Sequence, residues 1–288
     1  MVDSTPTGAS TPVGEFHYRI GWRSGGPLPG AHASRRLGPG VDFYGHVSLL
    51  ETTDPRRFDV LATQRDPQRS LRLRAYRQLG SIPVTALLDV SASMPAAAGG
   101  TLDLMADFVA ALGFSAVRTG DSFGVISADT KVRRELCLPT TRRRGAGLAY
   151  AERLRAYQPE GDGARGLLEA THYLLRQRGL LFLLSDFHFP LSDLERLMAA
   201  LGGHDVVPVP IWSEAERQLP SFGLVRLRDA ESGLERLLFM RPSLRKRIEI
   251  EVDQHRQDVL STLSRHGRRP LLLGARFDAE TVSRYFYG

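Results

Sequence analysis

Three oxygen-bearing side chains follow one strongly apolar segment of the sequence at alternate positions. Residues 82–88 are typical of a buried parallel strand, and Asp89, Ser91 and Ser93 come directly after them. In an open α/β sheet, the loops at the carboxyl ends of the strands form the functional edge. One carboxylate and two hydroxyls supply the hard oxygen ligands that suit Mg²⁺, and they leave coordination positions for water or a partner. We therefore expect a Mg²⁺ site here, the alternative being that the serines cap a helix and Asp89 bonds backbone amides.

A second acidic residue stands at the end of another apolar segment. Residues 180–184 predict a buried strand, and Asp186 follows it in Ser185-Asp186-Phe187. We expect Asp186 at the same edge of the sheet as Asp89, where it would bind the metal through a water molecule. Taken alone, an aspartate after a strand is more often a turn or cap residue, and the neighbouring His188 is more often a surface residue.

The elements that must position these residues alternate between strands and helices. Strands are predicted at 82–88, 123–128, 180–184 and 206–212, with 131–138 as the hairpin partner of the second. Helices are predicted at about 102–112, 147–157, 167–179 and 192–201, the last opened by a capping box of Ser192 and Glu195. This alternation predicts a doubly wound, mainly parallel α/β sheet.

Two smaller regions flank the α/β domain, which we place at 81–215. Residues 1–14 are predicted to be a disordered tail and 15–80 a small β-rich subdomain. Glycine and proline between 21 and 40 argue against a long strand there, so short strands are expected only at 42–50 and 70–76. Residues 216–288 are predicted to be a hairpin-helix extension. Its parts are a hairpin at 224–228 and 234–239, a helix at 243–266, a last strand at 270–273 and a helix at 279–287.

The composition excludes several classes of protein. The single cysteine, Cys137, excludes a disulfide scaffold and a cysteine-rich zinc site. Neither Lys131 nor Lys246 stands in a Gly-Lys-Ser/Thr context, and nucleophile-elbow and His-Glu-x-x-His motifs are missing, so we expect a protein that is not an enzyme. No apolar run approaches the roughly 18 residues that span a bilayer, and the N-terminus lacks a secretory signal, so we expect a cytoplasmic protein.

The basic character of the chain raises the question of nucleic-acid binding. The formal net charge is +6, carried almost entirely by arginine. The densest basic cluster, residues 142–144, has no interleaved aromatic residues and no recognisable nucleic-acid motif beside it. We therefore favour a solvated arginine-rich surface over a nucleic-acid interface.

The Asp-x-Ser-x-Ser spacing resembles the metal-ion-dependent adhesion site of von Willebrand factor A domains. Further segments resemble, in the same order, motifs of a bacterial branch of that superfamily long catalogued only as a domain of unknown function. These segments are Gly30–Ser34, Gly38–Phe43, Asp54–Asp59, Gly120–Val125, Leu183–Phe187 and Leu224–Asp229. The likeness extends over residues 16–288 and is far more specific than the Asp-x-Ser-x-Ser motif by itself.

This resemblance implies a partner and a mode of action. Genes of the branch that this chain resembles typically lie beside genes of MoxR-type AAA+ ATPases. The resemblance therefore implies a binding adaptor that helps such an ATPase mature or remodel other proteins. The segment Phe16–Ser24 is similar to the accessory protein of methanol-dehydrogenase gene clusters. The expected client is therefore a metalloenzyme complex, with methanol dehydrogenase as the candidate.

The sequence departs from the superfamily at one expected ligand. Von Willebrand A domains usually supply a threonine hydroxyl from a Gly-Thr-Asp-Leu-like loop, and Gly161 stands at the matching position here. Asp162 is a candidate replacement, either as a direct ligand or through water, although an aspartate in a glycine-rich turn needs no ligand to explain it. Without a replacement, the site would bind metal weakly or not at all.

The same loop also offers an alternative function. Gly161, Gly163 and Gly166 fit the Gly-x-Gly-x-x-Gly fingerprint of dinucleotide-binding oxidoreductases, with Asp186 as the acidic residue of the next strand end. That fingerprint must follow a buried strand, whereas residues 152–160 are polar and predict helix and loop. We therefore rank the oxidoreductase below the adaptor.

Overall fold

A five-stranded sheet forms the centre of the α/β body. The computed structural model describes residues 14–49, 51, 54–68, 70–92, 100–161, 165–212, 222–228, 235–266 and 269–288. Strands β3 (Pro83–Asp89), β4 (Ser122–Ala128), β6 (Leu180–Ser185) and β7 (Asp205–Pro210) are parallel, and β5 (Leu138–Thr141) is antiparallel to β4. Their order across the sheet is β5-β4-β3-β6-β7, which confirms the four predicted parallel strands and places the ends of β3 and β6 side by side.

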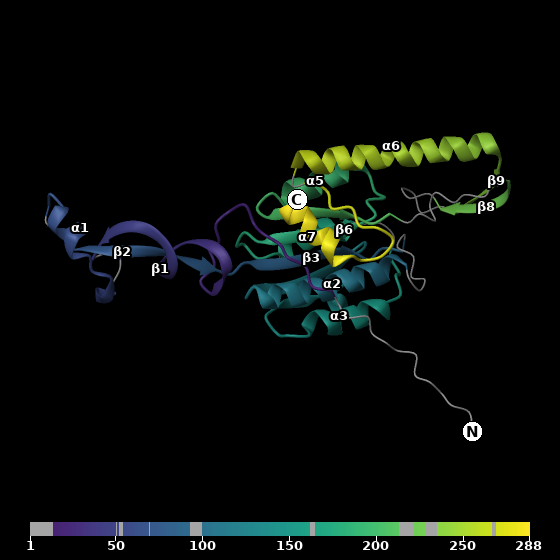
Figure 1. Cartoon of the computed structure of the whole chain (residues 1–288). Helices are drawn as coiled ribbons and strands as arrows, with labels where there is room; N and C mark the ends of the chain where they lie inside the picture. The colour runs from purple at the N-terminus through teal and green to yellow at the C-terminus, as the bar shows by residue number, and fades with distance from the viewer. Residues whose placement is uncertain are drawn as a thin grey trace, which may run out of the picture.

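Helices cover both faces of this sheet, as the alternating sequence predicts (Figure 1). One face packs against α2 (Thr101–Arg118), α3 (Ala146–Arg155) and the C-terminal α7 (Ala279–Tyr287). The other face packs against α4 (Arg165–Ala170), α5 (Leu191–Ala200) and α6 (Pro242–His266). The doubly wound α/β fold is therefore confirmed, and its strand order is von Willebrand A-like.

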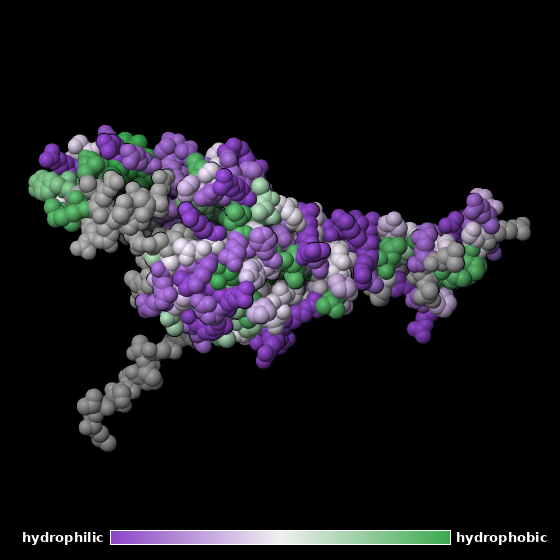
Figure 2. Space-filling view, turned by 180° about the vertical axis from the view of Figure 1, so that it is seen from behind, coloured by the Kyte–Doolittle hydropathy of each residue, from purple (hydrophilic) through white to green (hydrophobic). Residues whose placement is uncertain are grey.

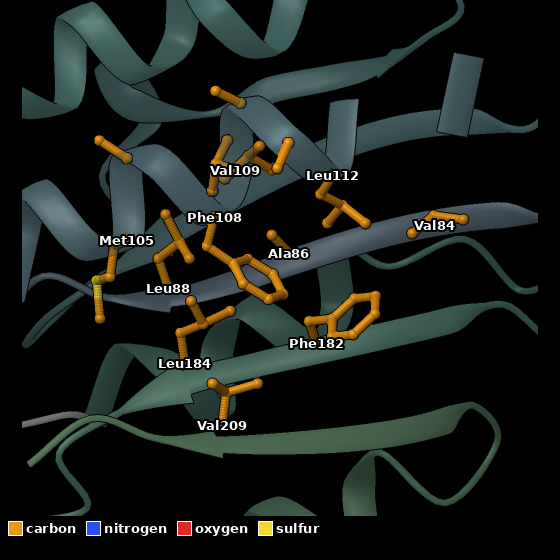
Figure 3. Close-up of a cluster of buried hydrophobic side chains, with 14 of the residues drawn as sticks. Val84, Ala86, Leu88, Met105, Phe108, Val109, Leu112, Phe182, Leu184 and Val209 are labelled. Carbon is orange, nitrogen blue, oxygen red and sulfur yellow. The ribbon is translucent and has the colours of Figure 1, made fainter. Parts of the chain in front are cut away.

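Side chains of the central strands alternate between two buried clusters. Ala86 and Leu88 of β3 face the α2 side together with Phe182 of β6, whereas Leu87 belongs to the cluster on the opposite face (Figure 3). Phe108 of α2 packs edge-on against Phe182 with ring centroids 5.2 Å apart. Because both faces are covered, apolar residues fill most of each central strand, and polar residues other than Thr85 of β3 lie at or next to the strand ends.

The antiparallel partner of β4 begins later than the sequence predicts. The predicted partner at 131–138 is correct only in part: Val132 forms an isolated antiparallel bridge with Ala128, residues Arg134–Leu136 form a 3-10 turn (η2), and regular pairing begins at Leu138. The cause is a local turn in which the Arg133 guanidinium lies 2.6 Å from the carboxylate of Asp129. This ion pair bends the chain before strand pairing resumes.

Two helix predictions also need correction. The helix expected at 167–179 ends at Ala170, because the hydroxyl of Thr171 donates to the Leu168 carbonyl (2.7 Å) and a 3-10 turn (η3, Thr171–Tyr173) follows. Helix α5 begins at Leu191, after Pro190, whose fixed φ starts the helix without a side-chain cap. Ser192 therefore lies inside α5, and the predicted capping box is wrong.

The predicted strand at 270–273 is replaced by an irregular extended segment. Its Leu271 amide donates to the Pro208 carbonyl of β7 (2.8 Å), so the segment lies along the edge of the sheet. Pro208, Pro210 and Pro270 have no amide hydrogen to donate, which prevents a regular ladder.

The rest of the C-terminal part agrees with its predictions. Strands β8 (Gly223–Arg228) and β9 (Glu235–Met240) form an antiparallel hairpin that leads into the long helix α6. Val259 and Leu263 in the second half of α6 are fully buried against the body. None of the helices in the described ranges is both long and apolar enough to cross a membrane.

A two-stranded arm projects from the body (Figure 1). Strand β1 (Pro29–Ser48) pairs antiparallel with β2 (Arg72–Gly80), and η1 (Pro55–Arg57) and α1 (Val60–Arg65) lie at its outer end. The prediction of only short strands is wrong here, because β1 accommodates its glycines and prolines through several shifts of register. Gly40 marks one such close approach, since a Cβ atom there would overlap the Arg77 carbonyl. The segment that precedes the arm in the chain packs on the body, where Phe16 and Tyr18 are buried.

Candidate metal centre

Asp89 is the last residue of β3, and its carboxylate is buried at the carboxyl edge of the sheet. The residue is only 1% exposed. Its Oδ2 accepts a hydrogen bond from the hydroxyl of Ser185 (2.6 Å), and its Oδ1 accepts one from the amide of Ser91 (3.1 Å). Because Ser185 ends the neighbouring strand β6, two strand ends converge on this carboxylate. Ser185 is not among the ligands that the sequence predicts, and its position at the end of a buried strand is the signal that could have identified it.

Asp186 follows Ser185 and is 3% exposed. Its Oδ1 accepts from the amide of His188 (3.0 Å), and its Oδ2 lies 3.3 Å from Nδ1 of the same histidine. Its main-chain carbonyl accepts from the indole nitrogen of Trp212 (2.8 Å), just beyond β7. The carboxylate and the backbone of Asp186 are thus both held, and His188 belongs to the edge of the site.

Burial and charge act together on Asp89. Its desolvation, followed by repulsion from the Asp186 carboxylate, raises the pKa of Asp89 to about 7, while hydrogen bonds from Ser185 and Ser91 work in the opposite direction. Two acidic groups therefore share one buried edge, and their negative charge is disfavoured there. A proton or a cation at this edge would relieve that repulsion.

The backbone after Asp186 adopts a conformation that is rare for a side chain of its kind. Phe187 has a φ of 56°, in the left-handed region, although it is a fully buried aromatic residue. This conformation costs roughly 1–2 kcal/mol for a residue other than glycine. The Phe187 amide donates to Ser185 Oγ (2.9 Å), so the turn is held by the same serine that binds Asp89. Backbone strain of this kind is concentrated at functional sites.

Helix α6 holds this turn from outside the sheet. Nε2 of His255 lies 3.1 Å from the carbonyl oxygen of Phe187. The guanidinium of Arg256, itself 8% exposed, stacks over the indole of Trp212 at 5.0 Å from the ring centroid. The second half of α6 is therefore coupled to the loop that carries Asp186.

A third buried acid at this edge was not predicted. Asp129 follows β4, is fully buried, and is held by the Arg133 side chain, with its Oδ2 2.8 Å from Nε. A Cβ atom at Gly161 would overlap the Asp129 carboxylate, so the position of the expected threonine is filled by this ion pair. The Gly161 carbonyl accepts from the amide of Ala92 (2.8 Å), which ties the two loops together. The strand-end rule that singled out Asp89 and Asp186 would also have found Asp129.

Two of the predicted ligands, Ser93 and Asp162, lie outside the described residues. Among the residues that are described, no group of three or more His, Cys, Asp or Glu side chains could hold a metal ion. A metal at this edge would therefore need hydroxyl ligands beside the carboxylates. The alternative interpretation, in which the serines cap a helix and Asp89 bonds backbone amides, is met in one part. Helix α2 begins after Gly100 without a side-chain cap, so Ser91 is not its N-cap. Asp89 does accept a hydrogen bond from a backbone amide, that of Ser91.

The structure also bears on the dinucleotide-binding alternative. The residues before the glycine-rich loop form α3 and, from 157 to 161, an irregular segment. The loop therefore does not follow a strand, as the fingerprint requires. Gly163, at the centre of the fingerprint, lies outside the described residues.

The sequence matches the model of the family described as "Protein of unknown function DUF58" over residues 55–258. The chain belongs to this family. It is similar to the uncharacterized proteins Mb1516 of Mycobacterium bovis and Rv1480 of Mycobacterium tuberculosis, each 30% identical over 267 residues, which cover 90% of this chain and 81% of the relative. Because the family description assigns no activity, function has to be argued from the site.

Two solved structures, of the protein BatB and of a VWA domain, are similar to this chain in fold. BatB from Bacteroides thetaiotaomicron is 14% identical, with a TM-score of 0.41, and the match covers 72% of this chain and all of BatB. The VWA domain of SpRpn10 is 16% identical, with a TM-score of 0.34, and the match covers 46% of this chain and 77% of that domain. These likenesses concern the fold alone.

Proposed function

We propose that this chain is a non-catalytic, metal-dependent protein-binding adaptor. In this proposal, Asp89, Ser91 and Ser93 hold Mg²⁺, Asp186 orients a coordinated water molecule, and Asp162 is a further candidate ligand. The adaptor works with a MoxR-type AAA+ ATPase in the maturation or remodelling of a metalloenzyme complex, with methanol dehydrogenase as the candidate client.

The pairing of Asp89 with Asp186 is the observation that carries the proposal. Both carboxylates are almost completely buried, at 1% and 3% exposure, and they share one edge of the sheet. Their repulsion is the reason why the pKa of Asp89 is raised beyond the effect of burial alone. A divalent cation would compensate this charge, and the carboxylate and hydroxyl oxygens at the edge are the hard ligands that Mg²⁺ prefers.

Protein recognition would use the coordination positions that the chain leaves open. When bound, Mg²⁺ would offer such a position to a carboxylate of a partner protein. Ser185 orients the Asp89 carboxylate, and Trp212 and His255 hold the loop that carries Asp186. Outer contacts of this kind fix metal ligands in place, and their loss typically weakens metal affinity about 10–100-fold.

Remodelling another protein requires energy from ATP hydrolysis, and we propose that the MoxR-type ATPase supplies it. Neither Lys131 nor Lys246 stands in a phosphate-binding context. The likeness to the bacterial von Willebrand A branch supports a MoxR-type ATPase as the source of that energy. The segment at 16–24 supports methanol dehydrogenase as the client.

Isothermal titration calorimetry of the full chain with Mg²⁺, Mn²⁺ and Ca²⁺ tests the metal site. Wild type should give saturable heat with at least one of the three ions, and Asp89→Ala should give none. Glu280→Ala, which removes an exposed acid of α7, should bind like wild type. Equal heats in wild type and Asp89→Ala, or no heat in either, would refute the metal site.

Sedimentation with purified MoxR-type ATPase and client complex from the same genome tests the adaptor role. Wild type should bring both proteins into one complex, and Asp89→Ala should lose one of them. If wild type binds neither protein, the proposed partners are wrong.

A further inference from the structure

The arm and the candidate metal centre lie at opposite ends of the central sheet. Strand β2 enters the body through Ser81 and Ile82 and is followed by β3, which ends at Asp89. The arm therefore leaves from the amino ends of the parallel strands (Figure 1), whereas Asp89 and Asp186 stand at their carboxyl ends. A protein bound at the outer end of the arm would leave the metal edge accessible.

The outer end of the arm exposes several apolar side chains among its described residues. We call this end the arm tip and define it by the apolar residues Leu49, Phe58, Val60, Leu61 and Leu71, which are 42–62% exposed, together with Arg56 and Arg65. The small core of the arm consists of Val47, Leu73 and Ala75. Apolar side chains stand among hydrophilic ones at this end of the molecule (Figure 2). Grouped exposed apolar residues of this kind mark binding surfaces.

The root of the arm is fixed to the body by a buried polar network. Asp121, which is fully buried, accepts from the Tyr18 hydroxyl (2.6 Å) and from the Ile82 amide (2.8 Å). His32 of β1 places Nε2 2.7 Å from the same carboxylate. The arm therefore leaves the body in a defined direction. A surface held in place in this way loses less conformational entropy when it binds.

The fold of the arm tip uses its own carboxylates. Each aspartate at the tip pairs with an arginine of the arm, and Asp59 also caps α1 by accepting from the Ala62 amide (3.0 Å). The pairs are Asp54–Arg57 (3.2 Å), Asp59–Arg74 (2.8 Å) and Asp66–Arg72 (3.0 Å). Arg56 and Arg65 are exposed and have no ion pair within the described part of the chain. The apolar residues of the tip are thus accompanied by two exposed arginines that no ion pair of the described residues engages.

We propose that the arm tip docks into an apolar groove, rimmed by carboxylates, on a partner protein. An apolar centre with a charged rim is the usual anatomy of a protein interface, and the rim arginines require acidic groups opposite them. A second copy of this chain docked tip to tip would place like charges together. The inference rests on the proposed adaptor role and adds to it a second binding end.

Site-specific photo-cross-linking in native cells tests this docking surface. Benzoylphenylalanine replaces Leu61 in the full chain, and a control chain carries it at Leu175, which is 45% exposed in the loop after η3. The Leu61 position should cross-link to one partner protein. That protein is then purified and titrated with wild type, Leu61→Glu, Arg65→Glu and Leu175→Glu. Both tip variants should bind at least tenfold more weakly, and the control should match wild type.

Each other outcome overturns the inference. Cross-linking no stronger than at Leu175, or a purified partner that binds Leu61→Glu like wild type, removes the docking surface. A cross-link to this chain itself assigns the tip to self-association, and binding to phosphatidylglycerol vesicles that is lost in Leu61→Glu assigns it to lipid. Failure of the metal site is distinguishable, because Asp89→Ala should keep the Leu61 cross-link and Leu61→Glu should keep the Mg²⁺ heat.

Discussion

The hydroxyl of Ser185 donates a 2.6 Å hydrogen bond to Oδ2 of Asp89 and thereby joins the ends of β6 and β3. The same oxygen accepts from the amide of Phe187 (2.9 Å). One serine thus fixes both a buried carboxylate and the strained turn beside it. This makes Ser185 the residue through which the geometry of the edge is most directly tested.

Ser185→Ala should destabilise the ionised site. It removes a hydrogen bond to a buried charged group, a loss of about 1.5–3 kcal/mol in the free energy of unfolding, and it raises the pKa of Asp89 further. Urea unfolding at pH 8 in EDTA measures the loss. Ser192→Ala, an exposed serine of α5, is the matched control and should change stability little. Equal stability of the two variants would contradict the role of Ser185.

Trp212→Phe should loosen the loop that carries Asp186. The change removes the indole donor to the Asp186 carbonyl (2.8 Å) but keeps an aromatic ring beneath Arg256. We expect a loss of about 1 kcal/mol and faster hydrogen exchange at residues 185–188. Trp22→Phe removes an indole donor to the Asp205 carboxylate (2.8 Å) and should leave exchange at residues 185–188 unchanged. The same exchange pattern in both variants would show that Trp212 has no specific effect.

Gly161→Ala should be destabilising because its Cβ atom would overlap the Asp129 carboxylate. Overpacking of this kind costs about 1–3 kcal/mol. Asp129→Ala should relieve the overlap, so the double variant should be more stable than the sum of the two single changes predicts. A double-mutant cycle from urea unfolding measures this coupling, with Gly203→Ala as the control because nothing surrounds its Cβ position. Additive effects would exclude the contact.

The arm tip should lose order in acid. Hydrogen bonds from the Ala62 amide, then from Arg74 and His46, hold the pKa of Asp59 well below its usual value. A lowered pKa means that this contribution to stability is complete above about pH 4 and is lost as pH falls further. The Ala62 amide resonance should therefore shift below that pH. In Asp59→Asn, whose amide oxygen caps without titrating, the shift should disappear, and its persistence would assign it to another group.

The sequence predicted the parts of the fold in which local pattern and burial agree. The apolar runs at 82–88 and 180–184 led to two adjacent parallel strands, and the strand-end rule placed Asp89 and Asp186 at one edge. The long strand β1 was missed because its glycines and prolines predict irregular structure, and only pairing with β2 shows how register shifts accommodate them. The conformational preferences of the β1 residues contain no information about the strand with which they pair.

Contacts between distant loops were also beyond the sequence. The overlap of Gly161 with Asp129 and the hydrogen bond of His255 with the Phe187 carbonyl join residues far apart in the chain. Their positions depend on how α4 and α6 pack on the sheet. The missing threonine could therefore be noted in the sequence, but the ion pair that takes its place could not.

The continuity of β2 with β3 has a mechanical consequence. Tension applied at the outer end of the arm runs along one stretch of backbone into the central strand, which is hydrogen-bonded to β4 on one side and β6 on the other. Parallel strands pulled along their length load these bonds in shear, so many must break together. The body should therefore resist pulling through the arm far better than peeling from the β5 edge, and a load at one end would reach the Asp89 end without unfolding the sheet.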